Sequence, residues 1–158
     1  VLLADDLILG ASCVKEMMDA YKGGNMVAVM DVPHEQTGSY GIVTPGADDG
    51  RIVQVEGLVE KPDPSSAPSN IAVVGRYIIT PEVFETLAAQ ERGAGGEIQL
   101  TDALAKQIGK APFSGVRFSG ERFDCGSKLG FLQANVAFGL NNDTVREQLR
   151  DWLGERLG

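Results

Sequence analysis

Short apolar runs that predict buried strands recur along this chain and are separated by turn-forming residues. The clearest is IAVVGRYII at residues 71–79, and MVAVMDV at 26–32 is a second. SYGIV at 39–43 and RIVQVEGLVEK at 51–61 follow the same pattern on either side of the turn PGADDG at 45–50. The sequence PFSGVRF with ERFDCG predicts a further strand or a pair of strands.

Helix signals lie between these runs. Ser12 can cap a helix in which Val14, Met17, Met18 and Tyr21 share one face. Three more helices are expected. One begins after the cap Thr80 with Pro81 at its first position, one begins after the cap Thr101, and one runs from about 128 to 139 after the cap Ser127. Alternating strands and helices predict a single α/β domain over residues 1–158, with a mixed, partly parallel sheet flanked by helices.

The tail over residues 143–157 carries an apolar face among charged residues, which predicts an amphipathic helix. A subunit contact and a cover over its own domain suit that helix equally well. The run Val1–Ala4 predicts a buried strand and has no initiator Met before it, so the sequence is expected to be a fragment that starts inside an element.

Composition narrows the class of partner. A net charge of -8 argues against nucleic acid, whose phosphates are bound by a surplus of Lys and Arg. No apolar run reaches the roughly 20 residues that cross a bilayer, and no signal peptide is visible, so a cytoplasmic protein without a membrane partner is expected. Cys13 and Cys125 are expected to be free thiols, and a single histidine argues against zinc.

Charged residues at strand ends are the candidates for a site, because ligands of open α/β sheets bind at the carboxyl ends of strands. Asp5 and Asp6 are expected to end the first strand, Glu60 and Lys61 the fourth, and Asp124 lies near the last. Two carboxylates from distant parts of a chain can hold Mg²⁺, which leaves its other positions for phosphate oxygens and water. The sequence therefore predicts a metal-assisted site for a small anionic ligand.

The pair Glu60–Lys61 suggests what that ligand is. Adjacent residues of a strand point to opposite faces, so the carboxylate and the ammonium need not neutralise each other. One can accept hydrogen bonds from hydroxyls while the other meets a phosphate, which suits a sugar phosphate. Gly41 and Gly75, each inside a predicted strand, either let a ligand approach the backbone or mark a bulge.

Several motifs together resemble one family. LADD, SYGIV, VEKP, GAGGEIQLTDAL and RFDCGSKLGF occur in the order and spacing of bacterial UTP:glucose-1-phosphate uridylyltransferases, also called UDP-glucose pyrophosphorylases. The resemblance runs from residue 1 to about residue 140. It implies a partial, Rossmann-like nucleotidyltransferase fold in which glucose 1-phosphate attacks the α-phosphorus of UTP, giving UDP-glucose and pyrophosphate.

The resemblance also implies roles for particular residues. It places Mg²⁺ on Asp5 and Asp124, and it makes Asp6, the backbone of Gly41 and the carboxylate of Glu60 contacts of glucose. Lys61 would meet the sugar phosphate and is the implied catalytic residue. Glucose 1-phosphate, UTP and UDP-glucose are the implied small-molecule partners, and a homo-oligomer is expected.

Members of this family begin with a strand and a glycine-rich loop carrying Arg and Lys, and residues 1–158 contain nothing that resembles it. Residues 1–158 alone are therefore expected not to catalyse uridylyl transfer. The alternatives are a sugar-1-phosphate nucleotidyltransferase using another nucleotide, and a non-catalytic sugar-phosphate-binding or oligomerisation module. A cysteine hydrolase using Cys125 with His34 lacks a nucleophile turn, and an aspartyl phosphatase lacks the Asp-x-Asp spacing.

Overall fold

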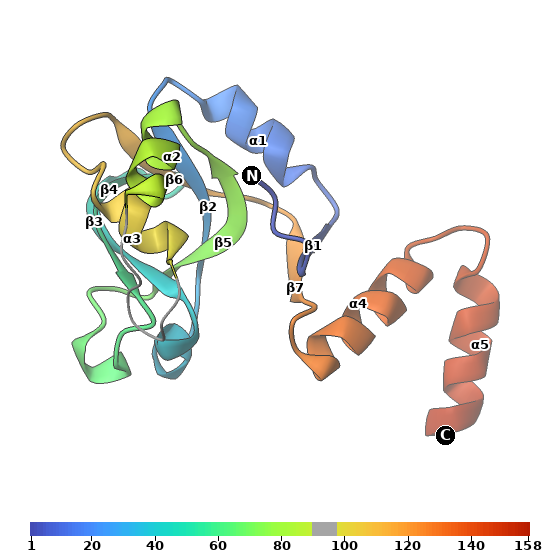
Figure 1. Ribbon diagram of the computed structural model, residues 1–158. Helices are drawn as coiled ribbons and strands as arrows, with labels where there is room; N and C mark the ends of the chain where they lie inside the picture. The colour runs from blue at the N-terminus through green and yellow to red at the C-terminus, as the bar shows by residue number, and fades with distance from the viewer. Residues whose placement is uncertain (90–97) are drawn as a thin grey trace. The chain divides into compact units, whose positions relative to one another are not determined.

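The computed structural model describes residues 1–89 and 98–158, which form two compact units (Figure 1). Unit 1 contains residues 1–2 and 13–118, and unit 2 contains residues 3–12 and 119–158. The segment ERGAGGE, which was expected to end a helix, lies outside the described residues. The single domain expected from the sequence stays a prediction, because two compact units can belong to one domain.

Five strands of unit 1 close into a barrel in the order β2-β5-β3-β4-β6. Their bounds are β2 (Asn25–Asp31), β3 (Gly41–Asp48), β4 (Ile52–Glu60), β5 (Ile71–Ile78) and β6 (Phe113–Arg117). β2 pairs parallel with β6 and antiparallel with β5, and the remaining pairs of the barrel are antiparallel. The predicted mixed, partly parallel sheet is therefore confirmed.

The core of unit 1 lies inside this barrel and beneath its helices. Residues 25–29 of β2 are all buried, since this strand lies between two neighbours and is covered on both faces. Side chains from all five strands of the barrel and from two helices gather in one cluster, which includes Val27, Val29, Val43, Val53, Ile71, Val83, Leu104 and Phe113.

In the described part of unit 1 the helices are α1 (Cys13–Ala20), α2 (Pro81–Ala88) and α3 (Leu100–Ala105), and the 3-10 turns are η1 (His34–Ser39) and η2 (Pro64–Ser66). α1 contacts β2 and β6 and buries Cys13 and Met17. The sequence predicts that Met17 and Met18 both pack in the core, but Met18 is 67% exposed, so the prediction is wrong for Met18. The buried stripe is set by residues 13 and 17, one turn apart, and Met18 lies a further 100° around the helix.

The helix expected to start after Thr101, with Thr101 as its cap, begins two residues earlier than predicted. Gln99 occupies the cap position of α3, and Thr101 lies inside the helix. The capping role expected for Thr101 is therefore wrong, and its hydroxyl instead lies beside Gly41.

Unit 2 consists of a two-stranded ribbon and two helices. β1 (Asp6–Leu9) pairs antiparallel with β7 (Glu121–Asp124), and α4 (Lys128–Leu140) and α5 (Arg146–Leu157) follow. Ser127 caps α4 as predicted, since its Oγ accepts a hydrogen bond from the Gly130 N–H at 3.0 Å. The tail helix begins at Arg146 rather than at 143, and it contacts α4.

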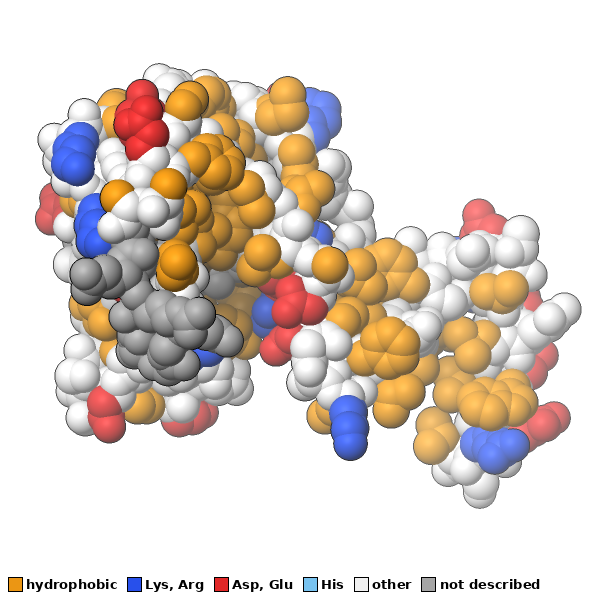
Figure 2. All heavy atoms as spheres, in the orientation of Figure 1, with side chains coloured by type: hydrophobic (Ala, Val, Ile, Leu, Met, Phe, Trp, Pro, Cys, Tyr) orange, Lys and Arg blue, Asp and Glu red, His pale blue; other side chains and the backbone are white. Residues whose placement is uncertain are grey.

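Several apolar side chains of α4 remain exposed, and Figure 2 shows them as an orange area on that helix. They are Leu129, Phe131, Leu132 and Phe138. Trp152 on α5 is half exposed and is covered on one side by the Arg156 guanidinium, 4.9 Å from the ring centre. α5 therefore covers only part of the apolar surface of its own unit.

The first residues do not form the buried strand that was expected. Val1, Leu2 and Leu3 are 49%, 62% and 40% exposed, and β1 begins only at Asp6. Val1 instead pairs with β5, since its carbonyl accepts from the Tyr77 N–H at 3.0 Å and its amine donates to the Tyr77 carbonyl at 2.8 Å. Asp5 and Asp6 therefore stand at the start of β1 and not at its end.

Two further expectations are tested by the described residues. Cys13 and Cys125 are both free thiols, as predicted. No described helix combines the length and the apolar character that spanning a membrane would require.

Candidate functional site

The carboxylates of Asp5 and Asp124 border the same small space. The antiparallel register of β1 and β7 places Asp6 opposite Asp124, so Asp5 lies just before that pair. A Cβ added to Gly126 would lie 3.1 Å from Asp124 Oδ1 and 3.4 Å from Asp5 Oδ2. Two acids that are 119 positions apart in the sequence thus converge on the space beside Gly126, which is open because glycine has no side chain.

The backbone fixes both acids. The Gly126 N–H donates to Asp124 Oδ1 at 3.0 Å, and the Cys125 N–H donates to the Asp5 carbonyl at 2.7 Å. The first turn of α4 also packs on the Asp124 backbone, because a Cβ on Gly130 would lie only 2.0 Å from the Asp124 carbonyl oxygen. The positive end of a 13-residue helix therefore lies against Asp124, where it favours negative charge.

This arrangement fits a hard divalent cation. Mg²⁺ is commonly held by one or two carboxylates and takes its remaining ligands from water and phosphate. Within residues 1–89 and 98–158 there is no group of three or more His, Cys, Asp or Glu side chains suited to a metal. Two converging carboxylates beside an open glycine are enough for Mg²⁺ but not for a zinc site.

Asp6 is buried, and its carboxylate forms an ion pair with Arg122, whose Nε donates to Asp6 Oδ1. Arg122 Nη2 also lies 4.0 Å from Asp124 Oδ1. The Asp6 and Arg122 side chains are only 6% and 12% exposed, so this pair is largely shielded from water. Sequence reasoning missed Arg122, although its position two residues before Asp124 on one strand predicts that both side chains point to the same face.

A second group of predicted residues lies in unit 1. Gly41 pairs directly with Glu60 between β3 and β4, and the register is regular there, so Gly41 does not mark a bulge. A Cβ on Gly41 would lie 3.1 Å from Glu60 Oε2 and 3.3 Å from Thr101 Oγ1. Glycine at this position lets a carboxylate and a hydroxyl approach the strand closely, and Thr101 is a second residue that sequence reasoning missed.

Lys61 follows β4 with a positive φ of 45°, which is the left-handed region that non-glycine residues rarely adopt. Its N–H donates to the Tyr40 carbonyl at 2.9 Å. The Lys61 ammonium lies 3.9 Å from Glu60 Oε1, so the two side chains do not point apart as expected. The strand alternation ends at Glu60, and the turn of the backbone at Lys61 brings its side chain back beside the carboxylate.

Gly75 lies where the pairing of β2 with β5 shifts register, between Val74 and Tyr77. A glycine at such an irregularity is explained by the bulge. Its carbonyl accepts a hydrogen bond from Arg76 Nη1 at 2.9 Å.

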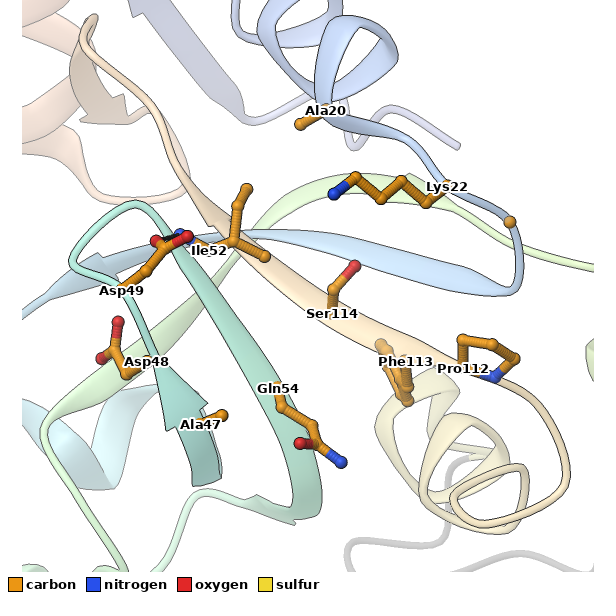
Figure 3. A pocket seen from close by; sticks show the side chains of 11 residues that line it. Ala20, Lys22, Ala47, Asp48, Asp49, Ile52, Gln54, Pro112, Phe113 and Ser114 are labelled. Atoms are coloured by element: carbon orange, nitrogen blue, oxygen red, sulfur yellow. Dashed lines mark hydrogen bonds between the residues drawn. The ribbon is translucent and has the colours of Figure 1, made fainter.

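A cavity of about 500 Å³ lies elsewhere in unit 1, and none of the predicted site residues line it (Figure 3). Lys22, Gln54 and Ser114 supply polar groups to it, above an apolar floor that includes Phe113. Asp48 on its rim is already paired with Arg117. This cavity is separate from the residues that the motifs single out.

The fold and these motifs are typical of the nucleotidyl transferase family. Residues 1–139 match the model of the nucleotidyl transferase family, and the chain belongs to that family. The predicted nucleotidyltransferase fold is therefore confirmed.

The relatives are more specific. A UTP–glucose-1-phosphate uridylyltransferase from Komagataeibacter xylinus is 51% identical over 156 residues, covering 97% of this chain and 52% of the relative. One from Staphylococcus haemolyticus (strain JCSC1435) is 39% identical over 158 residues, covering 98% of this chain and 55% of the relative. These names confirm the family resemblance, and the chain spans about half the length of the curated relatives that it matches.

Solved structures agree with this result. A crystal structure of UDP-glucose pyrophosphorylase complexed with UDP-glucose superposes with a TM-score of 0.84 at 37% identity, covering 90% of this chain and 56% of that chain. UTP-bound UGPase from Acinetobacter baumannii superposes with a TM-score of 0.85 at 33% identity, covering 98% of this chain and 55% of that chain.

Proposed function

We propose that this chain supplies the sugar-phosphate and metal sites of a UTP:glucose-1-phosphate uridylyltransferase, which forms UDP-glucose and pyrophosphate. The observation that supports this best is the pair of carboxylates around Gly126, found in a chain 51% identical to a protein of that name. Because the chain spans about half the length of its relatives, residues 1–158 alone are expected not to catalyse uridylyl transfer.

Glu60 and Thr101 are proposed to receive the sugar. The Glu60 carboxylate can accept hydrogen bonds from hydroxyl groups, and the Thr101 hydroxyl can donate or accept beside it. The backbone of Gly41 is the third proposed contact, and Gly75, also predicted from the sequence, would act only through the shape of β5. Asp6 was expected to contact glucose, and its burial with Arg122 leaves little of its carboxylate free for a ligand.

Lys61 is proposed to hold the phosphate of the sugar. Its side chain is 61% exposed, and such exposed ion pairs contribute little, so pairing with Glu60 leaves the ammonium available. The left-handed backbone of Lys61 supports this role, since strained residues of this kind concentrate at ligand-binding positions. Transfer of a phosphoryl-type group depends mainly on alignment and on charge, and Lys61 contributes to both.

Asp5 and Asp124 are proposed to hold Mg²⁺. The bound ion would supply positive charge that offsets the charge of phosphate oxygens. The chain's own contribution is to fix the two carboxylates, through the Gly126 and Cys125 N–H groups and the packing of α4 on Asp124.

Titration of residues 1–158 with UDP-glucose, followed by NMR with and without Mg²⁺, tests the proposal. The expected result is weak binding that depends on the metal. Glu60→Gln should weaken the binding of UDP-glucose, and Asp124→Asn should abolish its dependence on Mg²⁺. The matched control is Asp151→Asn on the exposed face of α5, which should change neither. A chain that binds no UDP-glucose under any condition would favour a purely structural module.

Further parts of the proposal rest on the same family. The nucleotide is proposed to be UTP, and titration with dTDP-glucose against UDP-glucose separates it from the alternative of another nucleotide. The protein is proposed to work in the cytoplasm, without nucleic-acid or membrane partners, and to form a homo-oligomer. The exposed apolar side chains of α4 support the oligomer, and light scattering measures it.

A further inference from the structure

Asp6 and Asp124 stand directly opposite each other in the β1–β7 ribbon. Like charges at directly opposed positions of an antiparallel pair repel and destabilise it. Asp5, next to Asp6 in the sequence, adds a third carboxylate. This corner of unit 2 therefore carries three acidic side chains close together. Something must offset their repulsion when no metal is bound.

Arg122 occupies the position that does this. It pairs with Ile8 in the register, so it lies diagonally across the ribbon from Asp6 and two residues from Asp124 on the same strand. Its Nε donates to Asp6 Oδ1, and its Nη2 lies 4.0 Å from Asp124 Oδ1. Only 12% of the Arg122 side chain and 6% of the Asp6 side chain are exposed, so the charge of Arg122 acts on Asp6 with little screening by water.

We propose that Arg122 is a positioning residue that keeps Asp6 out of the metal site, so that Asp5 and Asp124 are the carboxylates of this corner that remain for the divalent cation. This inference rests on the proposed function of Asp5 and Asp124. With Arg122 in place, three carboxylates and one guanidinium give the site two net negative charges, which match one divalent cation.

The arrangement has a consequence for affinity. A site with two free carboxylates holds Mg²⁺ loosely and leaves positions for the phosphate oxygens of a substrate, whereas a third carboxylate would take one of those positions. Arg122 therefore tunes the cation site toward weak, exchangeable binding by committing Asp6 to an ion pair.

Three variants of residues 1–158 test this charge balance with Mn²⁺ alone, measured by water-proton relaxation or by electron paramagnetic resonance. Arg122→Met frees Asp6 and should tighten Mn²⁺ binding by about tenfold, because the net negative charge rises. Asp6→Asn leaves Arg122 facing Asp124 and should weaken binding by about tenfold. The double variant Asp6→Asn with Arg122→Met restores the original net charge and should bind Mn²⁺ within about twofold of the unchanged chain.

A structural role alone predicts a different pattern. If Arg122 only held the ribbon together, Arg122→Met would weaken Mn²⁺ binding, and that result would overturn the inference. Arg122→Lys keeps the charge and should stay close to the unchanged chain. Should Arg122→Met fail to fold, as judged by circular dichroism, the double variant still decides, because removing both members of a buried ion pair is well tolerated. A dissociation constant of the double variant that differs by more than about twofold from that of the unchanged chain would then overturn the inference.

The outcomes separate this inference from the proposed function beneath it. If the unchanged chain binds no Mn²⁺, or binds it equally well after Asp124→Asn, the proposed metal site fails. If Mn²⁺ binding requires Asp124 and yet Arg122→Met and Asp6→Asn both leave the dissociation constant unchanged, the site stands and the role of Arg122 fails.

Discussion

Replacement of Gly130 by Ala tests how the first turn of α4 fixes the candidate metal site. Alanine is the better helix former by about 1 kcal/mol, so propensity alone predicts a more stable protein. The structure predicts the opposite, because the new Cβ would lie 2.0 Å from the Asp124 carbonyl oxygen and 2.8 Å from Ser127 Oγ. Real Cβ atoms essentially never come within 3.0 Å of such an oxygen, so the turn and the Asp124 backbone must separate by about 1 Å.

Forcing extra atoms into a packed site costs about 1–3 kcal/mol, and a contact with backbone belongs at the upper end of that range. After the gain in helix propensity, Gly130→Ala should destabilise the protein by about 1–2 kcal/mol. Because the displaced backbone carries the Asp124 carboxylate, Mn²⁺ binding should also weaken by about tenfold or more. Urea unfolding followed by circular dichroism and relaxation measurements with Mn²⁺ give the two numbers.

Gly154→Ala is the matched control. Gly154 also lies inside a helix, α5, and nothing lies within 4 Å of its added Cβ. This variant should be more stable by up to about 1 kcal/mol and should bind Mn²⁺ as before. A Gly130→Ala variant that matched Gly154→Ala in both measurements would refute the argument that α4 holds Asp124 by close contact.

Three further predictions concern unit 1. Thr101→Val should lose affinity for UDP-glucose in the NMR titration while Thr101→Ser retains it, because only the hydroxyl is proposed to bind the sugar; equal affinities would contradict this. Hydrogen bonds from Arg117 and from the turn backbone lower the pKa of Asp48, so the stability from that pair is present above about pH 4 and is lost as the pH falls further. The stability difference between the unchanged chain and Arg117→Met, followed by urea unfolding across pH 2–6, should therefore shrink toward the acid end, and a constant difference would count against it. Asn25→Ala should destabilise the fold by about 1–3 kcal/mol, because the buried Asn25 Oδ1 accepts a hydrogen bond from the Thr80 N–H at 2.9 Å. Thermal unfolding measures the loss, and an unchanged melting temperature would show that a water molecule replaces the Asn25 side chain as the acceptor.

Most elements could be predicted from the sequence because their signals are local. The strands 26–32 and 71–79 and the Ser127 cap depend on apolar patterning and capping within a few residues, and the structure has them within one residue. The predictions that proved wrong concern segments whose local sequence is compatible with two different structures. The run Val1–Ala4 is apolar enough for a buried strand, but whether it is buried depends on which strand lies beside it.

The candidate site divides in the same way. Asp5, Asp124, Glu60 and Lys61 could be singled out because ligands of open α/β sheets bind at strand ends and because the motifs around these residues resemble one family. Nothing local predicts that Arg122 pairs with Asp6, since the two residues are separated by 116 positions. The exposure of Met18 and the side-by-side placement of Glu60 and Lys61 were likewise decided by packing and by a turn of the backbone.

The sequence by itself determined the α/β class, the order of the strands and helices, and the family to which the chain belongs. Only the tertiary structure decided that β1 pairs with β7 in the register that sets Asp5 and Asp124 around Gly126 in unit 2. It also decided, separately, that Glu60 and Thr101 both lie against Gly41 in unit 1. The physical reason is that helix and strand propensities act over a few neighbouring residues, whereas the register of two distant strands follows from the burial of their faces and from contacts across the whole unit.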